Sequence, residues 1–276
     1  MRQTDLREST EHRRVILVNA PRLRILGPVS LVDTYGKRRD LAALKLRALL
    51  GYLLADRCRV VPVERLIGLL WGASPPKTAR TALHVYISNA RKVLDKTSLV
   101  PQVANLVTEG DGYVMVVDTT ELDLSRFERG VAEARLAEDH GDLELAAGML
   151  CDALAVWRGP ALSDVRISPT METMARRLDE KRIAAQLRLV RINIELGRDE
   201  DVIGDLYMLI AENPHNEKLC EYLMRALHNQ GRPADALQVY STFRATLREN
   251  LGLEPGQAIQ EFQHVVLSRE MVGYRR

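Results

Sequence analysis

The segment TARTALHVYISNARKVL, residues 78–94, carries side chains suited to binding a polyanion along one side of a predicted helix. Four apolar residues recur at the four-three-four spacing that stacks side chains on one helical face. They are Leu83, Ile87, Ala90 and Leu94. The other positions hold cations, hydroxyls, an amide and an aromatic ring, and no carboxylate occurs before Asp95. Because carboxylates would repel phosphates, their absence indicates a face that meets nucleic acid.

The residue types on this face match the chemistry of double-stranded DNA. Arg80, Arg91 and Lys92 can pair with phosphates and release counterions. Hydroxyl, imidazole and amide groups can form hydrogen bonds with base edges, and an asparagine amide can form two with adenine. The side chains with these groups are Thr81, His84, Ser88 and Asn89. The predicted helix spans roughly 24 Å, enough to lie in the major groove. A basic helix that is simply packed on one side and solvated on the other remains the alternative.

Charge is divided unevenly along the 276 residues. Residues 1–118 hold 19 Lys and Arg against 11 Asp and Glu, a net charge of +8. Residues 119–276 hold 20 against 26, a net charge of −6. This asymmetry is typical of a polyanion-binding half joined to a half with another task, although segments of this size also differ by several charges by chance.

The elements around the helix have the order of a winged helix-turn-helix. Alternating apolar residues from 22 to 33 predict a small strand pair. Helices are predicted over residues 41–56, 62–71 and 79–94. Residues 105–118, NLVTEGDGYVMVVD, predict a β-hairpin with a tight tip. In this order the second helix holds the third, whose free face is available for a groove.

The acidic half shows amphipathic helical patterns and no strand pattern. Three segments contain, near their start, a Gly followed by a polar residue, and continue with apolar residues at helical spacing: HGDLELAAGMLCDAL, LGRDEDVIGDLYMLI and QGRPADALQVYSTFR. Gly197 and Gly231 lie 34 residues apart, which is the tetratricopeptide period. We expect both glycines to end helices in left-handed conformation, and the repeats to form a short solenoid with a concave surface for a protein partner. Helical hairpins without a binding function show the same pattern.

The sequence contains no motif that indicates an enzyme, a metal site or a membrane protein. GxxxxGK[ST], GxGxxG, HExxH and GxSxG do not occur, and the six histidines lack ligand spacing. Cys58, Cys151 and Cys220 are far apart and predict reduced thiols in the cytosol. No apolar run is long enough to span a bilayer, and the N-terminus lacks a signal-peptide pattern. We therefore expect a cytoplasmic protein that is not an enzyme and takes no metal or cofactor.

Several motifs resemble those of the Streptomyces antibiotic regulatory protein family. RALLGYLLADRCRVVPVERLIGLLWGASPPKTARTALHVYISNARKVLD, followed by LVTEGDGYVMVV, is similar to its DNA-binding domain. FERGVAEARLAEDHGDLELAAGMLCDALAVWRGPAL and GRPADALQVYSTFRATLRENLGLEPGQAIQEF are similar to its bacterial transcriptional activator domain. The likeness covers about residues 22–270, and its strongest marks are LWG before PP, WRGPAL and LGLEPG.

The resemblance implies a mainly α protein with three parts. These are a flexible tail over residues 1–21, a winged helix-turn-helix (α+β) DNA-binding domain over residues 22–118, and an all-α, tetratricopeptide-like activator domain over residues 119–276. It implies a pathway-specific transcriptional activator of secondary-metabolite (antibiotic) biosynthesis genes. Such activators bind tandem direct repeats near the promoter −35 element as side-by-side protomers and recruit RNA polymerase holoenzyme.

By position, the resemblance places the third helix in the major groove and the hairpin wing in the adjacent minor groove. The groove-facing residues are then Arg80, Thr81, His84, Ser88, Asn89, Arg91 and Lys92. Further candidate phosphate or polymerase contacts are Arg38, Arg39, Lys45, Arg47 and Lys77.

Two positions depart from the family pattern. Asn89-Ala90 stands where the family usually carries Arg-Leu, which predicts a different preferred repeat; we expect Tyr86 or a residue of the first helix to fill the space beside Ala90. Glu109 and Asp111 stand at the wing tip, where a basic residue is more usual. This acidic tip predicts weaker or more partner-dependent DNA binding.

Two other functions remain open. One is a helical-repeat interaction scaffold whose basic half binds an acidic protein, and the other is a regulator whose helical domain senses a small ligand. DNA affinity that falls steeply with salt yet favours one sequence separates an activator from a scaffold.

Overall fold

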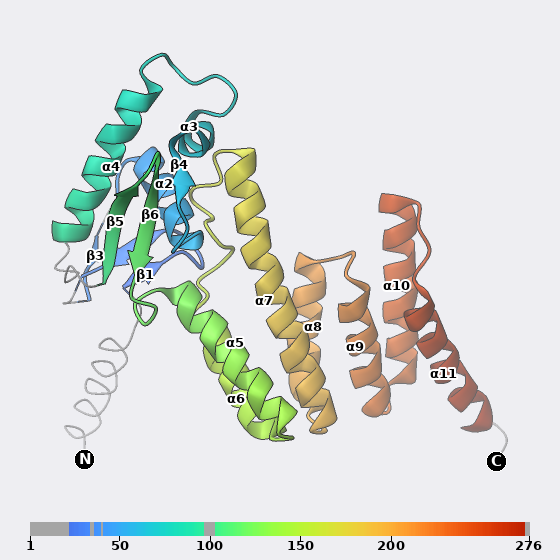
Figure 1. Cartoon of the computed structure of the whole chain (residues 1–276). Helices are drawn as coiled ribbons and strands as arrows, with labels where there is room; N and C mark the ends of the chain where they lie inside the picture. The colour runs from blue at the N-terminus through green and yellow to red at the C-terminus, as the bar shows by residue number, and fades with distance from the viewer. Residues whose placement is uncertain (1–21, 34–35, 40, 97–102, 274–276) are drawn as a thin grey trace, which may run out of the picture. The chain divides into compact units, whose positions relative to one another are not determined.

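The structure is a computed structural model that describes residues 22–33, 36–39, 41–96 and 103–273; the predicted tail over residues 1–21 lies outside them. Helices dominate the described residues, and two small sheets lie toward the N-terminus (Figure 1). The predicted fold class, a winged helix-turn-helix followed by helical repeats, is confirmed. Over the described ranges, the helices are all too short or too polar to cross a membrane.

The chain forms two compact units. The first contains the described residues up to Glu133 together with Asp152–Arg182, and the second contains Ala134–Cys151 and the residues from Ile183 onward. The segment with the WRGPAL motif therefore packs with the N-terminal elements. The domain boundary at residues 118/119 stays a prediction, because packing and sequence similarity need not divide a chain at the same place.

The first sheet confirms the predicted strand pair and adds a third strand. Its strands are β1 Leu23–Arg24, β2 Ser30–Val32 and β3 Arg38–Arg39, in the antiparallel order β1-β2-β3. Leu23 pairs with Leu31, and both side chains are fully buried. The strands are short, so this sheet depends on the elements packed on it.

Three helices and a second sheet complete the winged helix. The elements are α2 Leu44–Ala55, β4 Val61–Pro62, α3 Val63–Trp71, α4 Ala79–Lys96, β5 Ala104–Glu109 and β6 Gly112–Val117. Pro62 precedes α3 in extended conformation, and Gly72 follows it at a φ of 65°. The predicted order of elements is confirmed. Strand β4 was not predicted; it pairs with β6 and makes the wing three-stranded, in the order β4-β6-β5.

A buried carboxylate joins the first sheet to helix α5 (Asp123–Asp139). The Asp123 side chain accepts hydrogen bonds from the N–H groups of Ile25, Leu26 and Leu124 at 2.8–2.9 Å. The Arg158 guanidinium lies 3.6 Å from the same carboxylate. Burial raises the pKa of Asp123, while these N–H groups and Arg158 act against the rise. The first sheet is thus tied to α5 by polar contacts inside the core.

The WRGPAL segment packs against the same place. Trp157 meets Phe127 of α5 edge to face, with ring centroids 5.3 Å apart. The Arg158 N–H donates to the Leu26 carbonyl at 2.9 Å, and the Leu162 N–H donates to the Ile25 carbonyl at 3.0 Å. These bonds explain why residues 152–182 belong to the first unit.

The helices after α5 include those of the second unit, and the last four of them pack in chain order. The helices after α5 are α6 Leu143–Leu154, α7 Pro169–Glu195, α8 Asp199–Glu212, α9 Glu217–Asn229, α10 Pro233–Leu251 and α11 Gln257–Gly273. From α8 to α11 each helix contacts the next (Figure 1). Gly197 and Gly231 have φ values of 74° and 71°, so the predicted left-handed glycines at the repeat turns are confirmed.

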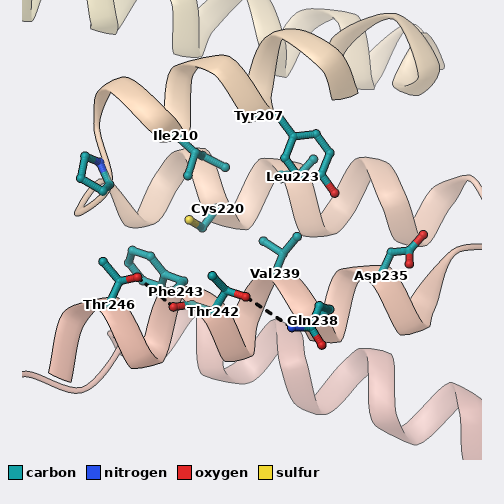
Figure 2. Close-up of a pocket in the computed structure, with 11 residues that line it drawn as sticks. Tyr207, Ile210, Cys220, Leu223, Asp235, Gln238, Val239, Thr242, Phe243 and Thr246 are labelled. Carbon is teal, nitrogen blue, oxygen red and sulfur yellow. Dashed lines mark hydrogen bonds between the residues drawn. The ribbon is translucent and has the colours of Figure 1, made fainter. Parts of the chain in front are cut away.

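The repeats leave a hollow between α8, α9 and α10. Figure 2 shows side chains from all three helices pointing into this space, among them Tyr207, Leu223 and Phe243. Its volume is about 260 Å³, and its lining is mainly apolar. Gln238 and Thr242 supply polar groups at its wall and are hydrogen-bonded to each other at 3.4 Å.

Candidate nucleic-acid interface

Helix α4 is fixed in the first unit by one apolar stripe. The predicted core residues of this stripe are at most 3% exposed: Leu83, Ile87, Ala90 and Leu94. The helix packs on α2, α3 and strand β5, and it lies beside the β5–β6 hairpin in Figure 1. The opposite side of α4 is therefore turned away from the core.

The exposed side of α4 is a second stripe with the same spacing. It consists of Thr81, Val85, Ser88 and Lys92, all exposed. Val85 lies in the middle of this stripe and is 54% exposed. Val85 is not among the predicted site residues, although its spacing of four from Thr81 and three from Ser88 places it between them. An exposed methyl-bearing side chain suits contact with a thymine methyl group.

His84 and Asn89 are exposed at the margins of this stripe. Tyr86 is half-buried instead, with its ring 6.2 Å from that of Trp71. Ala90 is fully buried, and the prediction that Tyr86 or a residue of α2 fills the space beside it stays a prediction. His84 and Asn89 are thus placed where they can reach a ligand bound along α4.

Arg91 is hydrogen-bonded to the hairpin, and its predicted phosphate contact stays a prediction. Its Nε donates to the Leu106 carbonyl and its Nη2 donates to Thr108 Oγ1, both at 2.8 Å. Its guanidinium also lies 5.9 Å from the centre of the Tyr113 ring. Arg91 therefore attaches the hairpin to α4 through two of its donors.

Replacing Arg91 with alanine is expected to loosen the wing. The change removes two hydrogen bonds and should lower the free energy of unfolding by about 1–2 kcal/mol. Chemical denaturation gives the size of the loss, and amide hydrogen exchange should show it concentrated in β5 and β6. Unchanged exchange in the hairpin would contradict this role; Lys92→Ala, on the exposed stripe, is the control.

Arg80 also turns toward the wing. Its Nη2 donates to Asp111 Oδ1 at the hairpin tip, at 2.8 Å. The two side chains are 54% and 76% exposed, so this ion pair lies at the surface. The acidic tip and one cation of the helix are thus in direct contact.

The other predicted basic residues differ in their availability. Lys77, before α4, and Arg38, in β3, are exposed. Lys45 is half-buried, with its Nζ 4.5 Å above the centre of the Trp71 ring. The side chain of Arg39 lies outside the described part of the chain.

Arg47 has partners within the first unit. Its guanidinium pairs with Asp164 at 3.0 Å and donates to the Leu41 carbonyl at 2.5 Å, and its side chain is 22% exposed. These partners hold Arg47 within the first unit, and its predicted contact with DNA or polymerase stays a prediction. In the described part of the chain, no group of His, Cys, Asp and Glu is arranged to hold a metal ion.

Family models match both halves of the chain. Residues 42–115 match the family described as "Transcriptional regulatory protein, C terminal", and residues 122–267 match the "Bacterial transcriptional activator domain". The first match covers α2 to the wing, including the exposed stripe of α4. The second covers the helical remainder from the start of α5.

Relatives share this arrangement over most of the chain. Regulatory protein DnrI of Streptomyces peucetius is 34% identical over 89% of this chain and 91% of its own length. Transcriptional regulator RedD of Streptomyces coelicolor is 32% identical over 91% and 71%. The structure of Mycobacterium tuberculosis EmbR in complex with a low affinity phosphopeptide matches with a TM-score of 0.83 and 32% identity, covering 91% of this chain and 65% of that one. The chain belongs to the Streptomyces antibiotic regulatory protein family of transcriptional activators.

Proposed function

We propose that the protein is a sequence-specific DNA-binding activator of secondary-metabolite (antibiotic) biosynthesis genes. It binds tandem direct repeats near the promoter −35 element, with a second protomer side by side, and recruits RNA polymerase holoenzyme. It acts in the cytoplasm, at the nucleoid. The observation that carries the proposal is the exposed stripe of α4, which lies opposite the buried stripe and contains no carboxylate.

The proposed binding mode divides the residues by the part of DNA that they contact. Base edges meet the exposed stripe and its margins: Thr81, His84, Val85, Ser88 and Asn89. Phosphates meet the exposed cations around it: Arg38, Lys77 and Lys92. Contacts of the first class select the sequence, whereas those of the second class set the position and the salt dependence.

The test is selection of bound fragments from the source genome by the purified full-length protein at near-physiological salt. Enrichment of promoter fragments that share a spaced direct repeat supports the proposal and also identifies the operator. Featureless enrichment, or none, contradicts it and favours the interaction scaffold. Transcription from an enriched promoter with purified polymerase then tests recruitment.

Replacing His84 or Asn89 with alanine is expected to relax base preference. Loss of a base contact should cost about 1–3 kcal/mol on the preferred site and little on sites changed at that base. Competition binding against a series of single-base operator variants measures this difference. Lys92→Ala is the matched control, because loss of a phosphate contact should weaken all sites about equally and reduce the salt slope by about 1. A uniform loss from His84→Ala and Asn89→Ala would contradict direct readout.

A further inference from the structure

The wing tip presents a carboxylate to helix α4. Asp111 Oδ1 accepts a hydrogen bond from Arg80 Nη2 at 2.8 Å. Both side chains are more than half exposed, so DNA along α4 would reach this pair. Arg80 is therefore bound, in the absence of DNA, to a group with the same sign of charge as a phosphate.

The backbone that carries Asp111 is held in place. The Val63 N–H, at the start of α3, donates to the Asp111 carbonyl at 3.0 Å. Pro62 of β4 pairs with Gly112, the next residue of the tip. A Cβ at Gly112 would lie 2.7 Å from the Val61 carbonyl oxygen, so the tip approaches β4 as closely as a glycine permits. The carboxylate is presented to Arg80 from an anchored turn.

The contact differs from the one that Arg91 makes with the same hairpin. Arg91 donates to a carbonyl and a hydroxyl, which are neutral and leave its positive charge in place. Asp111 instead neutralises the charge of Arg80. The hairpin is thus also held by Arg91, and the Arg80–Asp111 pair lowers the positive electric potential beside α4.

We propose that Asp111 is an internal competitor of DNA phosphate for Arg80, and that this pair keeps sequence-independent DNA binding weak. The inference rests on the proposed DNA-binding function. Carboxylates and phosphates bind guanidinium groups with the same geometry. An exposed pair contributes little stability, so phosphate can displace Asp111. The displacement breaks the Arg80–Asp111 pair and leaves a carboxylate beside the DNA backbone. Both effects reduce the binding free energy gained from the contact between Arg80 and phosphate.

The test is the substitution Asp111→Asn, with binding measured by fluorescence anisotropy on a labelled duplex of mixed sequence at a series of KCl concentrations. Affinity at low salt should rise about threefold to fivefold, because Arg80 no longer exchanges one anion for another. The salt slope should steepen by about 0.9, the value for one additional cation that pairs with phosphate. Thermal unfolding by circular dichroism shows that the variant retains its fold.

Two controls separate this mechanism from a general change in charge. Glu109→Gln removes the same charge from the same hairpin, and Glu109 is exposed. It should raise affinity less than Asp111→Asn does. In an Arg80→Ala background, Asp111→Asn should give no further gain, because the competition has been removed.

Four results would overturn the inference. An equal gain in the Arg80→Ala background, or an equal gain from Glu109→Gln, would mean that only net charge matters. A loss of affinity in Asp111→Asn would mean that Asp111 orients Arg80 for DNA. If the unaltered protein does not bind the duplex at any salt concentration, the proposed function itself fails. If it binds and Asp111→Asn binds equally well, only this inference fails.

Discussion

Replacing Asp123 with alanine is expected to destabilise the first unit by about 3–5 kcal/mol, the range for breaking a buried, hydrogen-bonded charge network. The change leaves the N–H groups of Ile25 and Leu26 without their acceptor in a buried setting. Each buried group without a partner costs about 1–3 kcal/mol. The Arg158 guanidinium also loses the carboxylate 3.6 Å away. Because typical domains are stable by about 5–15 kcal/mol, much of the protein should unfold at moderate temperature.

Chemical denaturation measures this loss, with the intrinsic fluorescence of Trp71 and Trp157, which both lie in the first unit, as the signal. Asp118→Ala is the matched control, since Asp118 is exposed and its side chain accepts hydrogen bonds from nearby Thr120. Asp118→Ala should lower the free energy of unfolding by well under half as much as Asp123→Ala does. Equal losses from the two substitutions would contradict the role assigned to Asp123.

The pH dependence of Asp123→Asn tests the same site. Burial raises the pKa of Asp123 in the folded state, so the folded state holds this proton more tightly than the unfolded state does. The stability that comes from protonation is present below the unfolded pKa and is lost as pH rises through the folded pKa. The asparagine variant should lack this part of the pH dependence.

Local periodicity was enough to predict the helix that carries the candidate site. The buried stripe of α4 follows from a four-three-four spacing that depends on residues within one helix. The turn glycines Gly197 and Gly231 were predicted for the same reason, because the conformation at a helix end depends on neighbouring residues. Val85 was not predicted as a site residue, because only polar and charged side chains were considered as candidates for the exposed face.

Partners that are distant in the sequence could not be predicted from local pattern. Arg47 and Arg91 were both predicted as candidate contacts, and the local pattern gave no sign that Asp164 and the carbonyl of Leu106 would be their partners. Composition identifies a cation, whereas its partner depends on which strands and turns the fold brings beside it. Strand β4 was missed because it has two residues, one of them a proline, and it pairs only through β6.

The contacts around Asp123, between the first sheet, α5 and the WRGPAL segment, also could not be predicted from local sequence pattern. The WRGPAL motif resembles a family motif in sequence. In the structure, the backbone N–H groups of Arg158 and Leu162 donate to the carbonyls of residues 26 and 25, which fixes the motif against the first sheet. Neither segment has a periodicity that indicates the other. A motif that looked like part of the helical half therefore belongs to the compact unit that carries α4.

Replacing Val85 with glutamate is expected to reduce DNA affinity about a hundredfold or more without changing the fold. Val85 lies in the middle of the exposed stripe, so a carboxylate there would face the groove and its phosphates. Like charges brought together in an interface cost several kcal/mol. Because the side chain is 54% exposed, the free energy of unfolding should change by only about 0.5 kcal/mol.

Leu136→Glu supplies the matched control for this substitution. Leu136 is 59% exposed on α5 and lies outside α4, so the variant has the same net charge with the carboxylate elsewhere. Anisotropy on a mixed-sequence duplex and on a selected operator should show a near-complete loss for Val85→Glu and a small change for Leu136→Glu. If Val85→Glu binds both duplexes normally, α4 does not enter the groove by this face, and the absence of acids along it needs another explanation. A loss confined to Val85→Glu assigns the face directly, because the two proteins differ only in where the added charge lies.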